Sequence, residues 1–352
     1  MPSDTFATAD QLVSAESELS ADTPVMSAED VALGSNEFHQ ARSCRIIVDS
    51  SADFSPEVLK RLDLELIPFS YVTPEGEVMD DQWASQTPHE FYEQFRKDPS
   101  LHYTTCAISP GRSLEVFEEA AKKGMPTIYV GLSGGLSSSI RNAEQAAEML
   151  REQYPDFELY VLDPCCDSVA VELLVIEMAR QASKGLTAHE VYEWACESRY
   201  FVHGYFTLDN LNALAAGGRI PPAAAQVGGK LDIKPELSYD TNGALTLCGV
   251  CRGRKKALRS IIDHFRERYS QDTSLPLAIV SADAEKDAAW LDAQVRKVPG
   301  CEHVAIIHST VGPILGSHVG PGMVALVFWG DDLREKLSLT DRIARKVRGG
   351  KA

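Results

Sequence analysis

The chain has 352 residues, of which 44% are hydrophobic and 24% are charged; this composition is typical of globular proteins and excludes a collagenous, fibrous or low-complexity chain. Its formal net charge of −17 and its pI near 5.0 argue against a nucleic-acid backbone or an anionic membrane surface as the main partner. A single domain usually has roughly 100–200 residues, so we expect two domains.

The first 42 residues form an acidic segment. No Lys or Arg precedes Arg42, whereas Asp and Glu recur there among Ser, Ala and Thr. With so few large apolar side chains, we predict a disordered extension over residues 1–42, a docked helix at residues 10–19 being the alternative. The segment lacks the basic and apolar regions of a secretory signal. The longest apolar run, residues 323–329, is far shorter than the roughly 20 residues that span a bilayer, so we expect a cytoplasmic protein without a membrane segment.

Eight cysteines in a chain of this size fit the reduced thiols of a cytosolic protein better than a disulfide framework. Cys248 and Cys251 have the CxxC spacing of zinc and redox sites. A zinc site needs further ligands, and a redox CxxC normally opens a helix. This pair falls instead in the predicted second strand of a hairpin, so we expect neither a metal site nor a redox centre.

Strands and helices alternate along residues 43–199. Short apolar runs predict strands at residues 44–48, 64–72, 127–130 and 158–162. Helices are predicted from Ser55-Pro56, from the capping box at Thr87, from Ser109-Pro110 to Gly124, at residues 137–151, at residues 169–182, and from a second capping box at Thr187. Such alternation is typical of an α/β domain with three layers and a parallel sheet.

The pattern changes after residue 199. Strands are predicted at residues 200–207, 231–239, 244–251, 277–281, 303–308 and 323–329, and helices at 255–269 and 287–298. Asn242-Gly243 suits a type I′ turn between two of these strands. Residues 312–322, rich in Gly and Pro, predict a loop that carries His318. We therefore predict a C-terminal α+β domain with a mixed sheet over residues 200–352, ending in a basic tail at about 340–352.

Three segments rich in Ser, Thr and Gly follow predicted strands, at residues 49–51, 104–111 and 131–139. Open α/β sheets bind ligands where strands lead into helices, and the N–H groups at a helix start favour an anion. With few basic neighbours, these hydroxyl groups suggest that a carboxylate or phosphate is held rather than attacked. Taken singly, each Ser or Thr is also explained as an N-cap or turn residue.

A second hypothesis comes from Gly131-Leu-Ser-Gly-Gly135, which fits the G-x-S-x-G nucleophile elbow of α/β-hydrolases. In that case the protein is a serine esterase with Ser133 as nucleophile, and Asp283 and His318 complete the triad. No HGGG-type oxyanion loop precedes the motif, so we rank this hypothesis below that of an anion-holding site.

Taken together, these segments resemble the DegV family over nearly the whole span from residue 45 to residue 329. The matching segments follow in the family's order: IVDSSAD at 47–53, TCAISPG at 105–111, SGGLSSSI at 133–140, GGRI at 217–220, IKP at 233–235, KKAL at 255–258 and GSHVGPG at 316–322. The sequence departs from the family's pattern at Cys106, Ala107 and Ser138. These departures affect which ligand and which partner protein we expect.

The resemblance implies a two-domain DegV-like fold that holds a long-chain fatty acid in an apolar tunnel. By position, Thr105, Ser137 and His318 would bind the carboxylate. The resemblance further implies a carrier without a cofactor rather than an enzyme, which presents the lipid to the ATP-binding subunit of a bacterial fatty-acid kinase system. Arg219 and Arg252 would then support acyl-phosphate formation or contact this partner.

Overall fold

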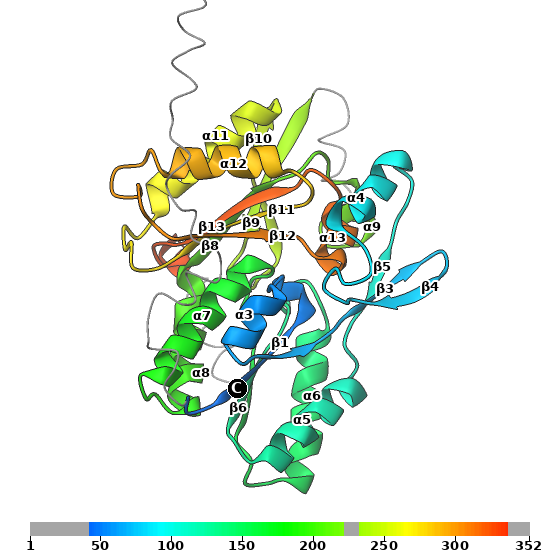
Figure 1. Cartoon of the computed structure of the whole chain (residues 1–352), viewed down its shortest axis with the longest axis vertical. Helices are drawn as coiled ribbons and strands as arrows, with labels where there is room; N and C mark the ends of the chain where they lie inside the picture. The colour runs from blue at the N-terminus through cyan, green and yellow to red at the C-terminus, as the bar shows by residue number, and fades with distance from the viewer. Residues whose placement is uncertain (1–41, 222–231, 337–352) are drawn as a thin grey trace, which may run out of the picture.

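The computed structural model describes residues 42–221 and 232–336 (Figure 1). The predicted extension before Arg42 and the predicted basic tail lie outside these residues. The described strands form a four-stranded, a six-stranded and a three-stranded sheet. No helix in the described part of the chain is long and apolar enough to cross a membrane.

The four-stranded sheet is parallel, with the order β2-β1-β6-β7. Its strands are β1 (Arg45–Asp49), β2 (Glu65–Ile67), β6 (Thr127–Val130) and β7 (Leu159–Leu162). The surrounding helices are α3 (Pro56–Arg61), α5 (Pro110–Lys123), α6 (Ser139–Gln153), α7 (Val169–Ser183) and α8 (Ala188–Ser198). In Figure 1, α7 and α8 lie on one side of β1 and β6, and α5 and α6 lie on the other. The predicted three-layer arrangement is confirmed.

The segment predicted as one strand at residues 64–72 is two strands that belong to different sheets. β2 ends at Ile67, and β3 (Ser70–Thr73) pairs antiparallel with β4 (Gly76–Met79) and β5 (Thr104–Cys106). Pro68 lies at the break, because proline has no N–H for a sheet ladder. The small sheet thereby carries residues 104–106 beside α4 (Pro88–Lys97), which opens with the predicted capping box at Thr87.

The six-stranded sheet is mixed, with the order β10-β9-β8-β13-β11-β12. Its strands are β8 (Val202–Thr207), β9 (Ile233–Tyr239), β10 (Leu245–Arg252), β11 (Leu277–Ser281), β12 (Ile306–Thr310) and β13 (Val324–Trp329). The other elements of this half are η3 (Arg199–Phe201), α9 (Asn212–Ala216), α11 (Arg254–Arg268), α12 (Glu285–Val295), α13 (Pro313–Val319) and η4 (Leu333–Lys336). The predicted mixed sheet is confirmed. Residue 199, the predicted domain boundary, is where the chain leaves α8 for this sheet.

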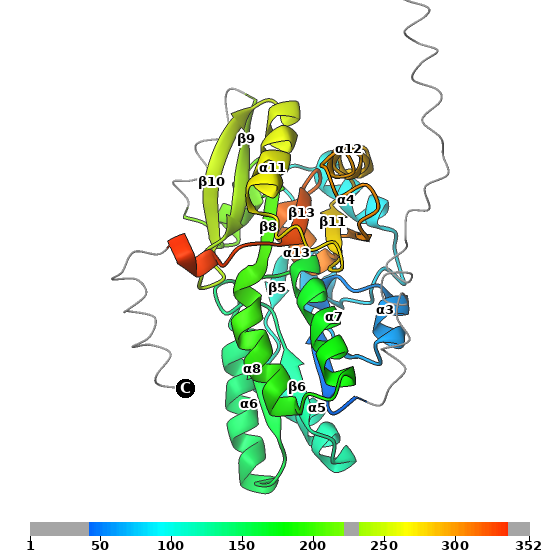
Figure 2. The ribbon, with the colours of Figure 1, turned by 90° about the vertical axis from the view of Figure 1, so that its left-hand side faces the viewer.

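Helix α7 joins the two halves. It contacts β8, β11 and β13 of the mixed sheet as well as α8, and Figure 2 shows it beneath these strands. Nearly all its side chains are buried, as expected for a helix covered on all sides. A single apolar cluster therefore includes both Ile46 of β1 and Val327 of β13.

The turn between β9 and β10 is not the predicted type I′. Gly243 has a φ of +74°, whereas Thr241 and Asn242 have negative φ, and a type I′ turn needs positive φ at both central residues. Gly243 N donates to the Asp240 carbonyl at 3.0 Å. The hairpin thus has a turn of ordinary hand followed by a glycine bulge.

The predicted loop at residues 312–322 is also wrong in part, because Pro313–Val319 form helix α13. Pro313 occupies the first turn, where its missing N–H costs nothing. Gly316 lies inside the helix for packing rather than for flexibility, since a Cβ there would come within 2.6 Å of the Tyr92 hydroxyl. His318 is consequently held on a packed helix.

Candidate functional site

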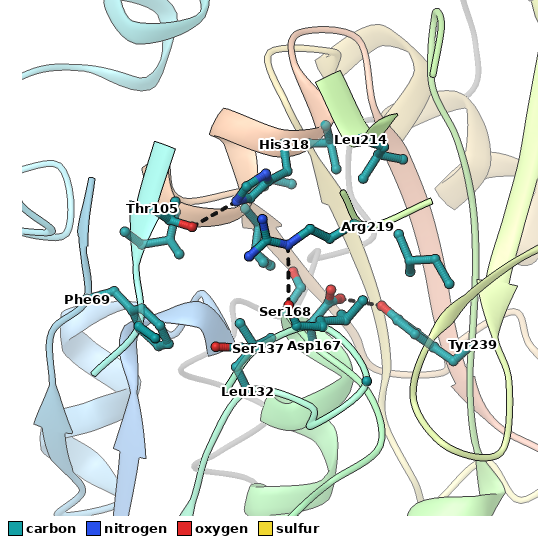
Figure 3. Close-up of a pocket in the computed structure, with 18 of the residues that line it drawn as sticks. Phe69, Thr105, Leu132, Ser137, Asp167, Ser168, Leu214, Arg219, Tyr239 and His318 are labelled. Carbon is teal, nitrogen blue, oxygen red and sulfur yellow. Dashed lines mark hydrogen bonds between the residues drawn. The ribbon is translucent and has the colours of Figure 1, made fainter. Parts of the chain in front are cut away.

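A cavity of about 420 Å³ lies where the loops that follow the parallel strands meet α13 and the β9–β10 hairpin (Figure 3). Its size falls within the range of about 300–1,000 Å³ that is usual for small-molecule sites. Much of its wall is apolar, with Leu132, Phe206, Leu214, Ile314, Leu315 and Met323 among the lining residues. Four of the five predicted site residues, Thr105, Ser137, Arg219 and His318, also line it.

Thr105 and His318 come from elements far apart in the chain and meet at the cavity wall. Thr105 Oγ1 and His318 Nε2 are 2.9 Å apart, within hydrogen-bonding distance. Burial, followed by the nearby charge of Arg219, lowers the pKa of His318 to about 4. The imidazole is therefore neutral near pH 7 and serves as a hydrogen-bonding group rather than as a cation.

Arg219 is a half-buried cation at this wall. Its Nε and Nη1 donate to the carbonyls of Leu136 and Gly217, at 3.3 and 2.5 Å. Among the described residues it forms no ion pair, and burial lowers its pKa. Gly217 allows α9 and α13 to approach, because a Cβ there would lie 2.5 Å from His318 Nδ1.

Ser137 lies in the loop that opens α6. Its Oγ is 3.0 Å from Ser139 Oγ and accepts the Ser139 N–H at 3.2 Å. Ser139 Oγ in turn accepts the Ile108 N–H at 3.1 Å. These bonds link the two hydroxyl-rich loops, one carrying Thr105 and the other Ser137, at a single cavity.

The structure does not bring Arg252 to the cavity. It is the exposed last residue of β10 and pairs with Ile233. Leu245, the first residue of the same strand, lines the cavity, so Arg252 lies about 20 Å farther along the strand. Its position suits contact with another molecule better than contact with a bound ligand.

Nor are the three residues of the hydrolase hypothesis brought together. Ser133 is fully buried, and its hydroxyl donates to the Gly243 carbonyl at 2.9 Å. Asp283 instead pairs with Arg96 and His89, while His318 pairs with Thr105. A serine nucleophile requires a base within hydrogen-bonding reach, and none of the nominated groups supplies one. Ser133 instead joins the β9–β10 turn to the loop after β6 through this hydrogen bond.

Cys248 and Cys251 lie in a strand, as predicted. Their thiols donate to Glu236, through the backbone oxygen at 3.3 Å and Oε1 at 2.7 Å. Burial raises the pKa of both cysteines to about 11, which keeps them as thiols near pH 7. No disulfide joins any of the cysteines in the described part of the chain. No group of three His, Cys, Asp or Glu residues suited to a metal ion occurs within the two described ranges.

Sequence reasoning missed four further polar residues of the cavity: Arg141, Asp167, Ser168 and Tyr239. The Tyr239 hydroxyl donates to Asp167 Oδ1, as Figure 3 shows. Burial raises the pKa of Asp167 to about 6. Asp167 lies before α7, whereas Tyr239 ends β9, and only the tertiary fold joins these positions.

A family model described as "Uncharacterised protein, DegV family" matches residues 43–331. This chain belongs to the DegV family. A DegV domain-containing protein of Clostridium perfringens is 30% identical over 286 residues, covering 81% of this chain and 97% of the relative. The resemblance inferred from sequence is thus confirmed.

Solved DegV structures share the fold. One described as a DegV lipid binding protein from Thermotoga maritima has a TM-score of 0.68 and 26% identity, and the match covers 82% of this chain and 98% of that chain. DegV of Bacillus subtilis, described as a fatty acid binding protein, has a TM-score of 0.69 and 25% identity, with 83% and 100% covered. The predicted two-part α/β architecture is therefore that of the DegV family.

Proposed function

We propose that this protein binds a long-chain fatty acid in the cavity, with the carboxylate beside Arg219, Thr105, Ser137 and His318. The observation that carries the proposal is the half-buried Arg219 cation, which has no ion-pair partner among the described residues and faces a cavity whose wall is both polar and apolar. A bound carboxylate would be the ion-pair partner of Arg219 and would accept short, charge-assisted hydrogen bonds from it. The fatty-acid-binding DegV protein of Bacillus subtilis supports the same ligand class.

The two parts of the ligand have different roles in this proposal. Burying the acyl chain against the apolar wall contributes about 0.8 kcal/mol for each CH₂ group removed from water. The carboxylate sets the orientation, because the hydroxyl of Thr105, the imidazole of His318 and the guanidinium of Arg219 lie close together on the cavity wall. A carboxylate also raises the pKa of a nearby imidazole, so His318 gains proton affinity when the ligand binds.

We further propose that the protein acts as a cytoplasmic carrier that presents the fatty acid to an ATP-binding fatty-acid kinase. Arg252 is exposed on β10, away from the cavity, where it is available to a partner protein. Arg219 lies beside the proposed carboxylate, where a fixed positive charge would stabilise the charge that develops during phosphoryl transfer. The kinase would supply ATP and its own catalytic groups.

Lipid extraction tests the binding proposal. Protein purified from cells and denatured in organic solvent should release fatty acid, identified by mass spectrometry, in an amount close to one per chain. Delipidated protein should bind added oleate or palmitate in a calorimeter. Protein that is repeatedly empty and binds neither acid would overturn the proposal, whereas binding without phosphorylation by any fatty-acid kinase would overturn only the presentation step.

A further inference from the structure

Asp167 and Tyr239 form a hydrogen-bonded polar pair on the cavity wall. In Figure 3 the pair lies across the cavity from Thr105, and Phe206 and Leu245 line the same region. The Phe206 and Tyr239 ring centroids are 6.4 Å apart. A Cβ on Gly204 would come within 2.8 Å of the Tyr239 ring. The phenol thus packs against strand β8.

The carboxylate of Asp167 has spare hydrogen-bonding capacity. The hydrogen bond from Tyr239 uses Oδ1, and no other bond from the described residues reaches this carboxylate. Asp167 forms no ion pair within these residues, and burial raises its pKa. Its side chain is nevertheless only partly covered by protein, and because the residue lines the cavity, Oδ2 is open to a ligand.

This arrangement affects which acyl chain fits. A plain polymethylene chain against Asp167 would strip water from an acceptor without replacing its hydrogen bond. A ligand hydroxyl at the same place would donate to Oδ2 and so replace the hydrogen bond of the displaced water. Sites that hydrogen-bond a hydroxyl discriminate strongly against analogues that lack it, because buried polar groups are then left unpaired.

We propose that Asp167 and Tyr239 form a subsite for a hydroxyl group on the acyl chain, so that the preferred ligand is a hydroxylated long-chain fatty acid. The inference rests on the proposed fatty-acid function and adds a substrate class to it. The carboxylate stays beside Arg219, Thr105, Ser137 and His318, and the hydroxyl is bound farther along the acyl chain.

Displacement of a fluorescent fatty acid from the delipidated full-length protein tests the subsite. The competitors are stearate and a series of stearates with one hydroxyl at carbon 3, 8, 10 or 12. We expect at least one hydroxystearate to bind tenfold or more tightly than stearate. Asp167→Leu should reduce this ratio to less than threefold while stearate affinity is kept or increased. Tyr239→Phe removes the donor to Oδ1 and leaves Oδ2 in place, so in this variant the ratio should be at least as high as in the wild type.

Thr105→Val is the matched variant, because it should weaken stearate and hydroxystearate equally and leave their ratio unchanged. Tyr239→Phe keeps the ring, so it tests the subsite even if Asp167→Leu does not fold. Equal affinity of wild-type protein for all competitors, or a ratio below threefold in Tyr239→Phe, would overturn the subsite and leave the fatty-acid function intact. Failure of every competitor to bind would instead overturn the function itself.

Discussion

Two buried polar clusters lie close together in this molecule, and they differ in whether their polar groups are satisfied. In the first, Asp49 accepts hydrogen bonds from Ser51, from Tyr129 at 3.1 Å and from the Leu132 N–H at 2.7 Å. Asp53 accepts from Ser168 and from the Gly312 N–H at 2.8 Å. In the second cluster, on the cavity wall, the guanidinium of Arg219 donates hydrogen bonds only to backbone carbonyls.

This difference in hydrogen bonding indicates that the first cluster stabilises the fold and the second binds a ligand. Satisfied carboxylates join loops: Asp53 connects the start of the parallel sheet to the segment before α13. A cation on a cavity wall that has no anionic partner can bind the anion of a ligand. Removing a group from the first cluster should therefore cost stability, and removing one from the second should cost affinity.

Asp53→Ala should have the largest effect. Both Ser168 Oγ and Gly312 N would lose their acceptor inside the protein, and each unsatisfied buried group costs about 1–3 kcal/mol. We expect urea denaturation to show a free energy of unfolding lower by about 3 kcal/mol. Asp53→Asn, which keeps one acceptor oxygen, should be milder, and the exposed Glu148→Ala should have no effect. Equal stability of Asp53→Ala and wild type would remove the distinction between the clusters.

Arg219→Met should show the opposite behaviour. Loss of the charge-assisted bonds to a carboxylate should weaken oleate binding by about 10- to 100-fold. The midpoint of thermal unfolding of ligand-free protein should stay the same or rise, because a desolvated charge is removed. Calorimetry and thermal unfolding measure the two effects on one sample, with Arg259→Met on the exposed face of α11 as control. Unchanged affinity would place the carboxylate elsewhere in the cavity.

The sequence predicts many of the helices and strands around these clusters. The capping boxes at Thr87 and Thr187 and the Gly124 helix stop are present in the structure. Capping is local, because a side chain bonds to backbone a few residues away. Short apolar runs likewise predict β1, β6 and β7 of the parallel sheet, whereas the run at residues 64–72 does not show where β2 ends and β3 begins.

The missed features depend on contacts between distant residues. The glycines and prolines of residues 312–322 predict a loop, whereas part of this segment is helix α13, in which the nearby Tyr92 hydroxyl leaves no room for a Cβ at Gly316. Asp167 and Tyr239 are 72 residues apart, and neither position carries a local signal of pairing. For Arg252 the error is the opposite one: the resemblance to the family suggests a site residue, whereas the fold places it at the end of β10, away from the cavity.

His318 should give a smaller, pH-dependent effect. Its folded-state pKa of about 4 lies below the ordinary value of 6.5, so between these values the unfolded chain binds the proton and the folded protein does not. Stability from His318 is therefore complete above pH 6.5 and is lost as pH falls towards 4, by on the order of 2–3 kcal/mol.

The measurement is the difference in unfolding free energy between wild type and His318→Asn at several pH values. Asn stays neutral, so this difference should shrink by 2 kcal/mol or more, to order of magnitude, between pH 7 and pH 4.5. Subtraction of the variant removes the opposing contributions of Asp49 and Asp167, whose pKa values are raised to about 6. A constant difference over this range would show that His318 is not held neutral by burial.

Arg252→Ala should have the smallest effect on the ligand and tests the division between cavity and surface. Because Arg252 is exposed about 20 Å along β10 from the cavity, we expect oleate affinity to change by less than about twofold, a change well under 1 kcal/mol. Acyl-phosphate formation with a fatty-acid kinase should nevertheless fall, with an increased KM for the loaded carrier, because an exposed cation acts on encounter with an oppositely charged partner. Arg219→Lys provides the contrast: it keeps a charge at the cavity but loses the bidentate geometry, so affinity should fall while the KM for carrier that remains loaded stays near the wild-type value. If Arg252→Ala instead released the lipid, the exposed end of β10 would be coupled to the cavity, and ligand binding could not be assigned to the Arg219 cluster alone.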